Sequence, residues 1–245
     1  MRQMFENAFL FTGNGLKAWD VEEVTDMYRL FAWTQNMNTD LRGWNTLRVS
    51  NMEEMFRDSN FNNDLSLWKT NRVTTMKYMF HNTRLFTGDH DLSKWDLGEV
   101  TNMQGMFQGA SVFNGNVGGW ITANSKVTNM QYMFHTCHLF SGVGLNDWDT
   151  TSVSLMNGLF DHAYVFNADI SKWQTSKVTT TAQMFRQAKV FNADLSKVGL
   201  FFLLFYLFFG FALSFYCCAA LRFHKEQHLC RPPPHLSPLT NKDVV

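Results

Sequence analysis

The stretch VTNMQYMFHTCHLFSGVGLNDWDTTS, residues 127–152, contains the pattern that decides the fold. Within it, Met130, Met133, Phe134 and Cys137 stand at positions i, i+3, i+4 and i+7. Side chains at these spacings lie on one face of an α-helix, because its period is 3.6 residues. The stretch therefore predicts a short helix, followed by a loop and by an extended segment that ends at a tryptophan.

The same pattern recurs along most of the chain. Successive copies open with a valine, at spacings of 25, 24, 27, 27, 26 and 25 residues. The opening residues are Val24, Val49, Val73, Val100, Val127, Val153 and Val178. A further copy, lacking its opening, begins at Met1. Fixed periods of this length are typical of proteins that stack one small unit on the next. We therefore expect residues 1–197 to form an α/β solenoid of about eight coils, each a short strand plus a short helix.

A hydroxyl residue precedes each predicted helix. In the quoted unit it is Thr128, and Gln131 follows three residues later. This spacing is that of a capping box, in which two side chains satisfy free backbone N–H groups at the start of a helix. Glu53 and Gln104 hold the same place in their own units. The helix would have only about two turns and would be unstable alone, so its stability must come from the neighbouring coils.

Large apolar residues recur in every unit and predict the core. One phenylalanine, one tryptophan and one or two methionines per coil are expected to be buried, each contributing roughly 1.5–3 kcal/mol. The tryptophans that hold one place in seven consecutive units are Trp19, Trp44, Trp68, Trp95, Trp120, Trp148 and Trp173.

Aspartates recur four residues before the tryptophan position. They are Asp40, Asp64, Asp91, Asp169 and Asp194. We interpret each carboxylate as an acceptor of backbone N–H bonds in its own turn. A column of aligned carboxylates that binds cations is the alternative.

Two short clusters offer metal-ligand chemistry. The run HTCH, residues 135–138, contains two imidazoles and a thiol, which are ligand types of zinc. The register places Cys137 at a small core position and His135 and His138 at outward positions, so we interpret the run as structural. The run DHD, residues 89–91, lies in a long insert and is interpreted as a plain loop.

No sequence signature of catalysis is present. The chain has no P-loop, no dinucleotide-type glycine pattern and no Gly-x-Ser-x-Gly elbow. We assign no catalytic, cofactor-binding or metal-ligating residues, and we expect a protein that is not an enzyme and has no cofactor. The 21 basic and 21 acidic residues balance, which argues against a nucleic-acid partner.

The repeats resemble a known family. VTNMQGMFQGASVFNGN, residues 100–116, and FNADISKWQTSKVTT, residues 166–180, are similar to the bacterial surface-protein repeat, also called the Mycoplasma lipoprotein-associated repeat. That repeat is a relative of the BspA-like leucine-rich repeats, and the resemblance covers residues 1–197. It implies a leucine-rich-repeat-like stack, often displayed on cell surfaces and linked to adhesion or partner binding. It implies no catalytic residues.

The repeat stops after Lys197, where the next residue of the unit should be tryptophan. Residues 198–221 carry no charge, and about 20 apolar residues can cross a bilayer as a helix. Basic residues follow at once, as on the cytoplasmic side of a membrane span. These features predict a single-pass transmembrane helix over 198–221, a disordered tail over 222–245, and membrane localisation with the coils outside.

Three functional interpretations stay open from the sequence. The first is a non-enzymatic, membrane-anchored or surface scaffold for adhesion or for binding a protein or surface ligand. In the second, the gene product is incomplete or mis-spliced, because Lys-Val-Gly at residues 197–199 can be encoded by a splice-donor-like sequence. The apolar run is then translated intron without a role. The third is a tail-anchored scaffold in the cytosol; an extracellular protein without an anchor is a further possibility for its location.

Overall fold

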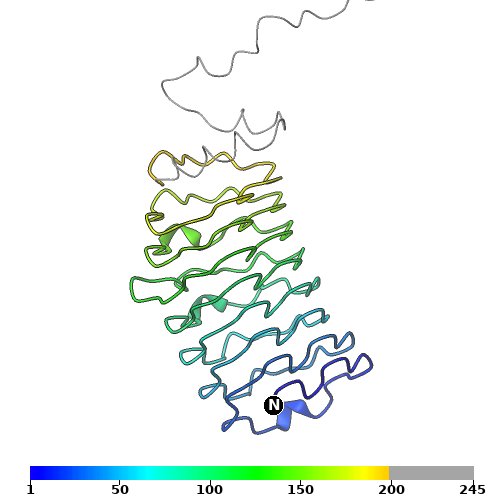
Figure 1. Ribbon diagram of the computed structural model, residues 1–245. Helices are drawn as coiled ribbons and strands as arrows, with labels where there is room; N and C mark the ends of the chain where they lie inside the picture. The colour runs from blue at the N-terminus through cyan, green and yellow to red at the C-terminus, as the bar shows by residue number, and fades with distance from the viewer. Residues whose placement is uncertain (199–245) are drawn as a thin grey trace, which may run out of the picture. The chain divides into compact units, whose positions relative to one another are not determined.

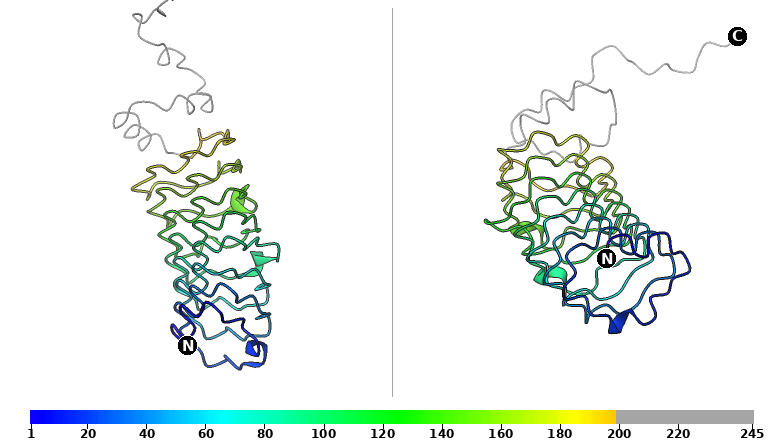
Figure 2. Two further views of the ribbon diagram at one scale, coloured as in Figure 1. Left: turned by 90° about the vertical axis from the view of Figure 1, so that its right-hand side faces the viewer. Right: turned by 60° about the horizontal axis from the view of Figure 1, so that its bottom comes forward.

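The computed structural model of the protein describes residues 1–198. These residues wind into coils that lie one above another, from the blue coil at the N-terminus to the yellow coils near residue 198 (Figures 1 and 2). Backbone hydrogen bonds join each coil to the next throughout the described part. The core lies inside the coils, and one cluster of buried apolar residues runs from Leu16 to Val198.

The coils contain almost no regular secondary structure. Residues 1–198 contain three short 3-10 helices: η1 (Leu16–Ala18), η2 (Leu92–Lys94) and η3 (Leu145–Asp147). The only β pairing among these residues is a row of isolated parallel bridges that joins Asp26, Asn51, Thr75, Asn102, Asn129, Leu155 and Thr180 in sequence. The predicted α/β solenoid, with a leucine-rich-repeat-like strand and helix in each coil, is therefore wrong.

Two consecutive turns replace the predicted helix. In the quoted unit, the N–H of Met133 donates to the carbonyl of Met130 (3.2 Å), and the N–H of Cys137 donates to that of Phe134 (3.1 Å). The third residue of each turn is left-handed, with φ of 55° at Tyr132 and 58° at Thr136. A left-handed third residue is the feature of a type II turn. Two such four-residue turns in series place apolar side chains at i, i+3, i+4 and i+7, as a helix does.

The turns direct their remaining backbone groups toward the neighbouring coil. Met130, Tyr132, Phe134 and Thr136 donate their N–H groups to carbonyls 25 residues further on, at 2.8 to 3.0 Å. In an α-helix these donors would bond within the segment. Buried backbone groups are nearly always paired, so each coil depends on the next one for its hydrogen bonds.

Hydroxyl groups also connect coils instead of capping helices. Thr128 donates its Oγ1 hydrogen to the carbonyl of Thr101 (3.3 Å), and Ser154 donates to the carbonyl of Thr128 (3.2 Å). The N–H of Gln131 donates to Oδ1 of Asn129, in its own turn (3.0 Å). The predicted capping boxes are therefore wrong, because the hydroxyls belong to a ladder that runs along the stack.

The predicted aromatic core is confirmed. Phe107 is fully buried, and its ring stacks on Phe80 and Phe134 of the adjacent coils at centroid distances of 5.4 and 5.8 Å. Six of the seven recurring tryptophans are buried to 2% exposure or less, and Trp19, in the first coil, is 40% exposed.

Each buried tryptophan is also fixed by its indole N–H. Trp120 donates from Nε1 to the carbonyl of Leu92 in the preceding coil (2.8 Å), while Trp95 donates its backbone N–H to the same oxygen (3.0 Å). The leucine therefore stands three residues before its own tryptophan because its carbonyl closes a turn. The segment that we expected to be extended is a turn.

The interpretation of the aspartate column as turn residues is confirmed. Asp64 accepts the backbone N–H of Ser66 (2.8 Å), and Asp169 accepts that of Ser171 (2.9 Å). Asp40, Asp91 and Asp194 accept the corresponding bonds two residues further on. Accepting these bonds lowers the pKa of Asp169 and Asp194 below its usual value.

The membrane prediction is corrected. No helix within residues 1–198 is long and apolar enough to cross a bilayer, so the structure does not bear out the predicted single-pass protein and its membrane localisation. Residues 199–221 of the predicted span, and the tail 222–245, lie outside the described residues. Val198, the first residue of that span, belongs to the last described coil, where its side chain is buried and its N–H donates to the carbonyl of Leu195 (3.0 Å).

Candidate functional site

The outward side chains of the two-turn segments form one continuous strip, which we call the turn face. Side chains at equivalent positions of successive coils contact one another along it, as Lys77 does with Glu53 and Asn82 with Asp58. The turn face carries two clusters, one of arginines and aromatic rings in the first coils and one around Asp161 in the later coils.

The arginine–aromatic cluster consists of Arg2, Tyr28, Arg29, Trp33, Arg57 and Tyr78. Each guanidinium lies over a ring, at 4.4 Å for Arg2 over Tyr28 and at 5.3 Å for Arg57 over Trp33. Cation–π contacts of this kind contribute about 0.5–1 kcal/mol at exposed sites. Rings and guanidinium groups therefore hold one another in place across consecutive coils.

Glu54 fixes the two central arginines of this cluster. Its oxygen Oε2 lies 2.9 Å from Nε of Arg29 and 2.9 Å from Nη1 of Arg57, and its side chain is 7% exposed. Burial raises the pKa of Glu54, but the hydrogen bonds from Arg29 and Arg57 outweigh it and hold the pKa below its usual value. The carboxylate is thus ionised at neutral pH and keeps both arginines in one geometry.

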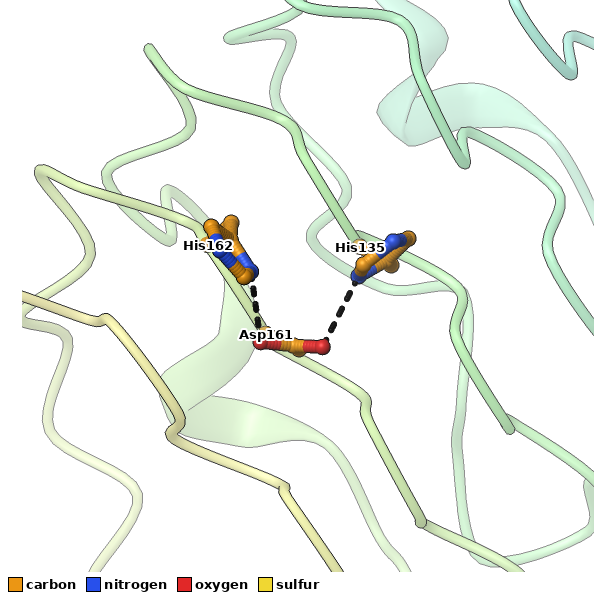
Figure 3. Close-up of side chains that lie close together, drawn as sticks. All are labelled: His135, Asp161 and His162. Carbon is orange, nitrogen blue, oxygen red and sulfur yellow. Dashed lines mark hydrogen bonds and ion pairs between the residues drawn. The ribbon is translucent and has the colours of Figure 1, made fainter.

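The Asp161 cluster joins three coils. The Asp161 side chain has no exposed surface, and Arg186 of the following coil contacts it through Nε (2.9 Å) and Nη2 (2.6 Å). Nδ1 of His162 lies 2.7 Å from one carboxylate oxygen, and Nδ1 of His135 lies 3.1 Å from the other. Figure 3 shows the two imidazole rings on either side of the carboxylate, both turned toward it.

The charge state of this cluster follows from its contacts. Burial raises the pKa of Asp161. The hydrogen bonds from Arg186 and His162 and the charge of Arg186 lower the pKa by more than burial raises it, so the pKa is below its usual value. Burial lowers the pKa of His135. At neutral pH the cluster therefore combines an anionic carboxylate, a cationic guanidinium and a neutral His135 ring.

The runs interpreted as structural from the sequence have the expected places except at His135, whose side chain is only 21% exposed and lies against Asp161 instead of pointing outward. Cys137 is fully buried, donates its thiol hydrogen to the carbonyl of Phe107 (2.9 Å), and has a pKa raised well above its usual value by burial. His138 stacks on Tyr164 at 4.5 Å. The run DHD, residues 89–91, is exposed, as expected of a loop. The structure therefore does not bring His135, Cys137 and His138 together as ligands.

Sequence reasoning missed Asp161 and His162. Both stand 26 or 27 residues after His135, so no local motif connects them. The repeat register was the available signal, because it places His135, Asp161 and Arg186 at the same position of three consecutive units.

Comparison with known proteins gives a family and no function. No curated protein matches the chain. The model of the family described as "Mycoplasma protein of unknown function, DUF285" matches residues 1–120, 48–141 and 120–200. These segments together span residues 1–200, which is most of the chain and all of the described coils. The chain therefore belongs to this Mycoplasma family of unknown function.

Proposed function

We propose that residues 1–198 are a non-enzymatic scaffold that binds a protein partner through the turn face. The arginine–aromatic cluster is the observation that carries this proposal. Arg, Tyr and Trp are enriched among the residues that dominate binding energy at protein interfaces. Here such side chains are half-buried and held by one another, as Arg29 and Arg57 are by Glu54.

The physical argument is that these side chains are already held in place before a partner binds. Ordering a long side chain at an interface costs about 0.5–1.5 kcal/mol. The side chains of Arg29 and Arg57 are only 27% and 28% exposed and already make ion pairs and ring contacts. A partner that packs on Trp33 therefore contacts side chains that have little conformational entropy left to lose on binding.

The proposal includes the closer family relationship inferred from the repeat sequences. Relationship to bacterial surface-protein repeats and BspA-like proteins agrees with a role in partner binding and adhesion. The proposal does not require a membrane anchor, because every residue that it uses lies in the coils.

Selection of peptides on the full chain tests the proposal. We expect peptides selected from a random phage-displayed library to bind at least tenfold more weakly to Trp33→Ala and Arg57→Ala, because truncated interface anchors cost about 2 kcal/mol or more. Lys172→Ala is the matched control, since this exposed residue pairs with Asp147 outside the turn face. Selection of no peptide, or equal binding to all variants, contradicts the proposal.

A second candidate is that the chain after Lys197 has no role and that the native repeat continues with tryptophan. Val198 supports it, because its N–H bond to Leu195 matches that of Trp173 to Ile170. The last described coil thus places valine where the repeat has tryptophan. We expect transcript sequencing to find a junction that joins the Lys197 codon to a tryptophan codon; transcripts that all read through to the Val198 codon contradict this candidate.

A further inference from the structure

The Asp161 cluster brings three potential metal ligands to one place. One ring nitrogen of His135, one ring nitrogen of His162 and a carboxylate oxygen of Asp161 all lie within 4.8 Å of one another. Two imidazoles and one carboxylate form a common ligand set of Zn²⁺ and of related divalent transition ions. Bonds from these atoms to such an ion would be about 2.0–2.2 Å long.

His135 provides a second, independent observation. Its Nδ1 atom is buried and lies 3.1 Å from Oδ2 of Asp161, but it makes no hydrogen bond of acceptable geometry with any of the described residues. A buried polar atom without a partner costs about 1–3 kcal/mol, and few such atoms occur in native proteins. A cation beside the Asp161 carboxylate would provide the missing partner.

Arg186 is compatible with a cation at this place. An ionised carboxylate offers about four lone-pair sites, and Arg186 uses two of them through Nε and Nη2. His162 contacts one of the remaining sites and His135 faces the other, and a metal ion would take over both. Arg186 would then orient the ligating carboxylate, as outer-shell partners of metal sites do, although its charge weakens the site.

We propose that His135, Asp161 and His162 form a binding site for a divalent transition-metal ion, with Zn²⁺ as the representative. The ligands come from two adjacent coils, so the ion would join the unit that opens at Val127 to the unit that opens at Val153. Neutral imidazole and ionised carboxylate are the forms that bind metals.

Zinc titration of the full chain tests this proposal. We expect isothermal titration calorimetry with Zn²⁺ to show one equivalent that is lost, or bound at least tenfold more weakly, in His135→Gln and His162→Gln. His81→Gln is the matched control, because His81 holds the position of His135 two coils earlier and lies beside Asp58 (3.7 Å). No second histidine joins that pair among the metal-ligand groups of residues 1–198, so we expect its Zn²⁺ binding to equal that of the wild type.

Two further measurements keep the result specific. Cysteine thiolates are also Zn²⁺ ligands and the sequence contains four cysteines, so the Co²⁺ absorption spectrum is compared and the lost equivalent must lack thiolate charge-transfer bands. Unfolding curves without metal show whether each variant folds. Asp161→Asn should lose the same equivalent, and if this variant does not fold, the two histidine variants decide alone. Equal numbers of Zn²⁺ equivalents, bound with equal affinity by the wild type and both histidine variants, overturn the proposal.

Discussion

Replacing Trp120 by alanine is expected to lower the free energy of unfolding by about 4 kcal/mol, because truncating a buried tryptophan typically costs 3–5 kcal/mol. The indole is 1% exposed and stacks on Trp95 at 5.8 Å and on Phe107 at 6.0 Å. Its loss leaves a cavity between two coils, which neither coil can fill alone. Chemical denaturation measures the change in free energy, and the midpoint of thermal unfolding should fall by roughly 10 °C.

Two variants separate the contributions to this effect. Trp120→Phe keeps most of the stacking and loses the Nε1–H bond to Leu92. Since the Leu92 carbonyl still accepts the backbone N–H of Trp95, we expect a loss of only about 1 kcal/mol from the hydrogen bond. Trp19→Ala, at the 40% exposed position of the first coil, is the matched control and should cost about 1 kcal/mol. If Trp19→Ala destabilises the protein as much as Trp120→Ala, the burial argument is wrong.

The sequence pattern predicted which residues are buried but not the conformation of the backbone. The burial of Met130, Met133, Phe134 and Cys137 was predicted correctly, because a helix and a pair of four-residue turns place the same positions inward. The two conformations differ in φ at the third residue of each turn. Glycine reveals that difference at Gly105 and Gly158, since glycine adopts positive φ without steric cost.

Most coils carry no glycine at this position. Tyr78, Tyr132 and Gln183 adopt positive φ there, and a sequence-based rule expects positive φ to be rare for such residues. Inter-coil bonds compensate for the strain, as the bond from Tyr132 to Asn157 (3.0 Å) does. The backbone conformation is therefore decided by contacts 25 residues apart, which a local pattern does not contain.

The Asp161 cluster was missed for a related reason. Ligand motifs such as HTCH are recognised because their residues are close in the sequence. In this stack, residues at the same position of successive units are in contact although they are far apart in the sequence. His135, Asp161 and Arg186 are such a column. Comparing the charged residues at equivalent positions of successive units, instead of neighbours along the chain, would have identified the Asp161 cluster.

Asp58 is expected to make stability depend on pH in the acid range. Its carboxylate is 25% exposed, lies 3.1 Å from Nε of Arg57, and accepts a hydrogen bond from Asn82 (2.9 Å). Burial raises the pKa of Asp58, but the neighbouring His81 and the hydrogen bonds from Asn82 and Arg57 outweigh burial and lower the pKa from 3.8 to about 2.

A pKa that is lower in the folded state stabilises the protein above the unfolded-state value and loses that contribution as pH falls through the folded-state value. For Asp58 the contribution is fully present above about pH 5 and is lost between about pH 4 and pH 2, and it amounts to about 2 kcal/mol. Urea denaturation of the wild type and Asp58→Asn at several pH values should show a difference of this size at pH 6 that disappears near pH 2. Asp89→Asn, at an exposed loop carboxylate, is the control and should follow the wild-type curve. A difference between Asp58→Asn and the wild type that stays constant from pH 6 to pH 2 would show that the Asp58 charge does not stabilise the stack.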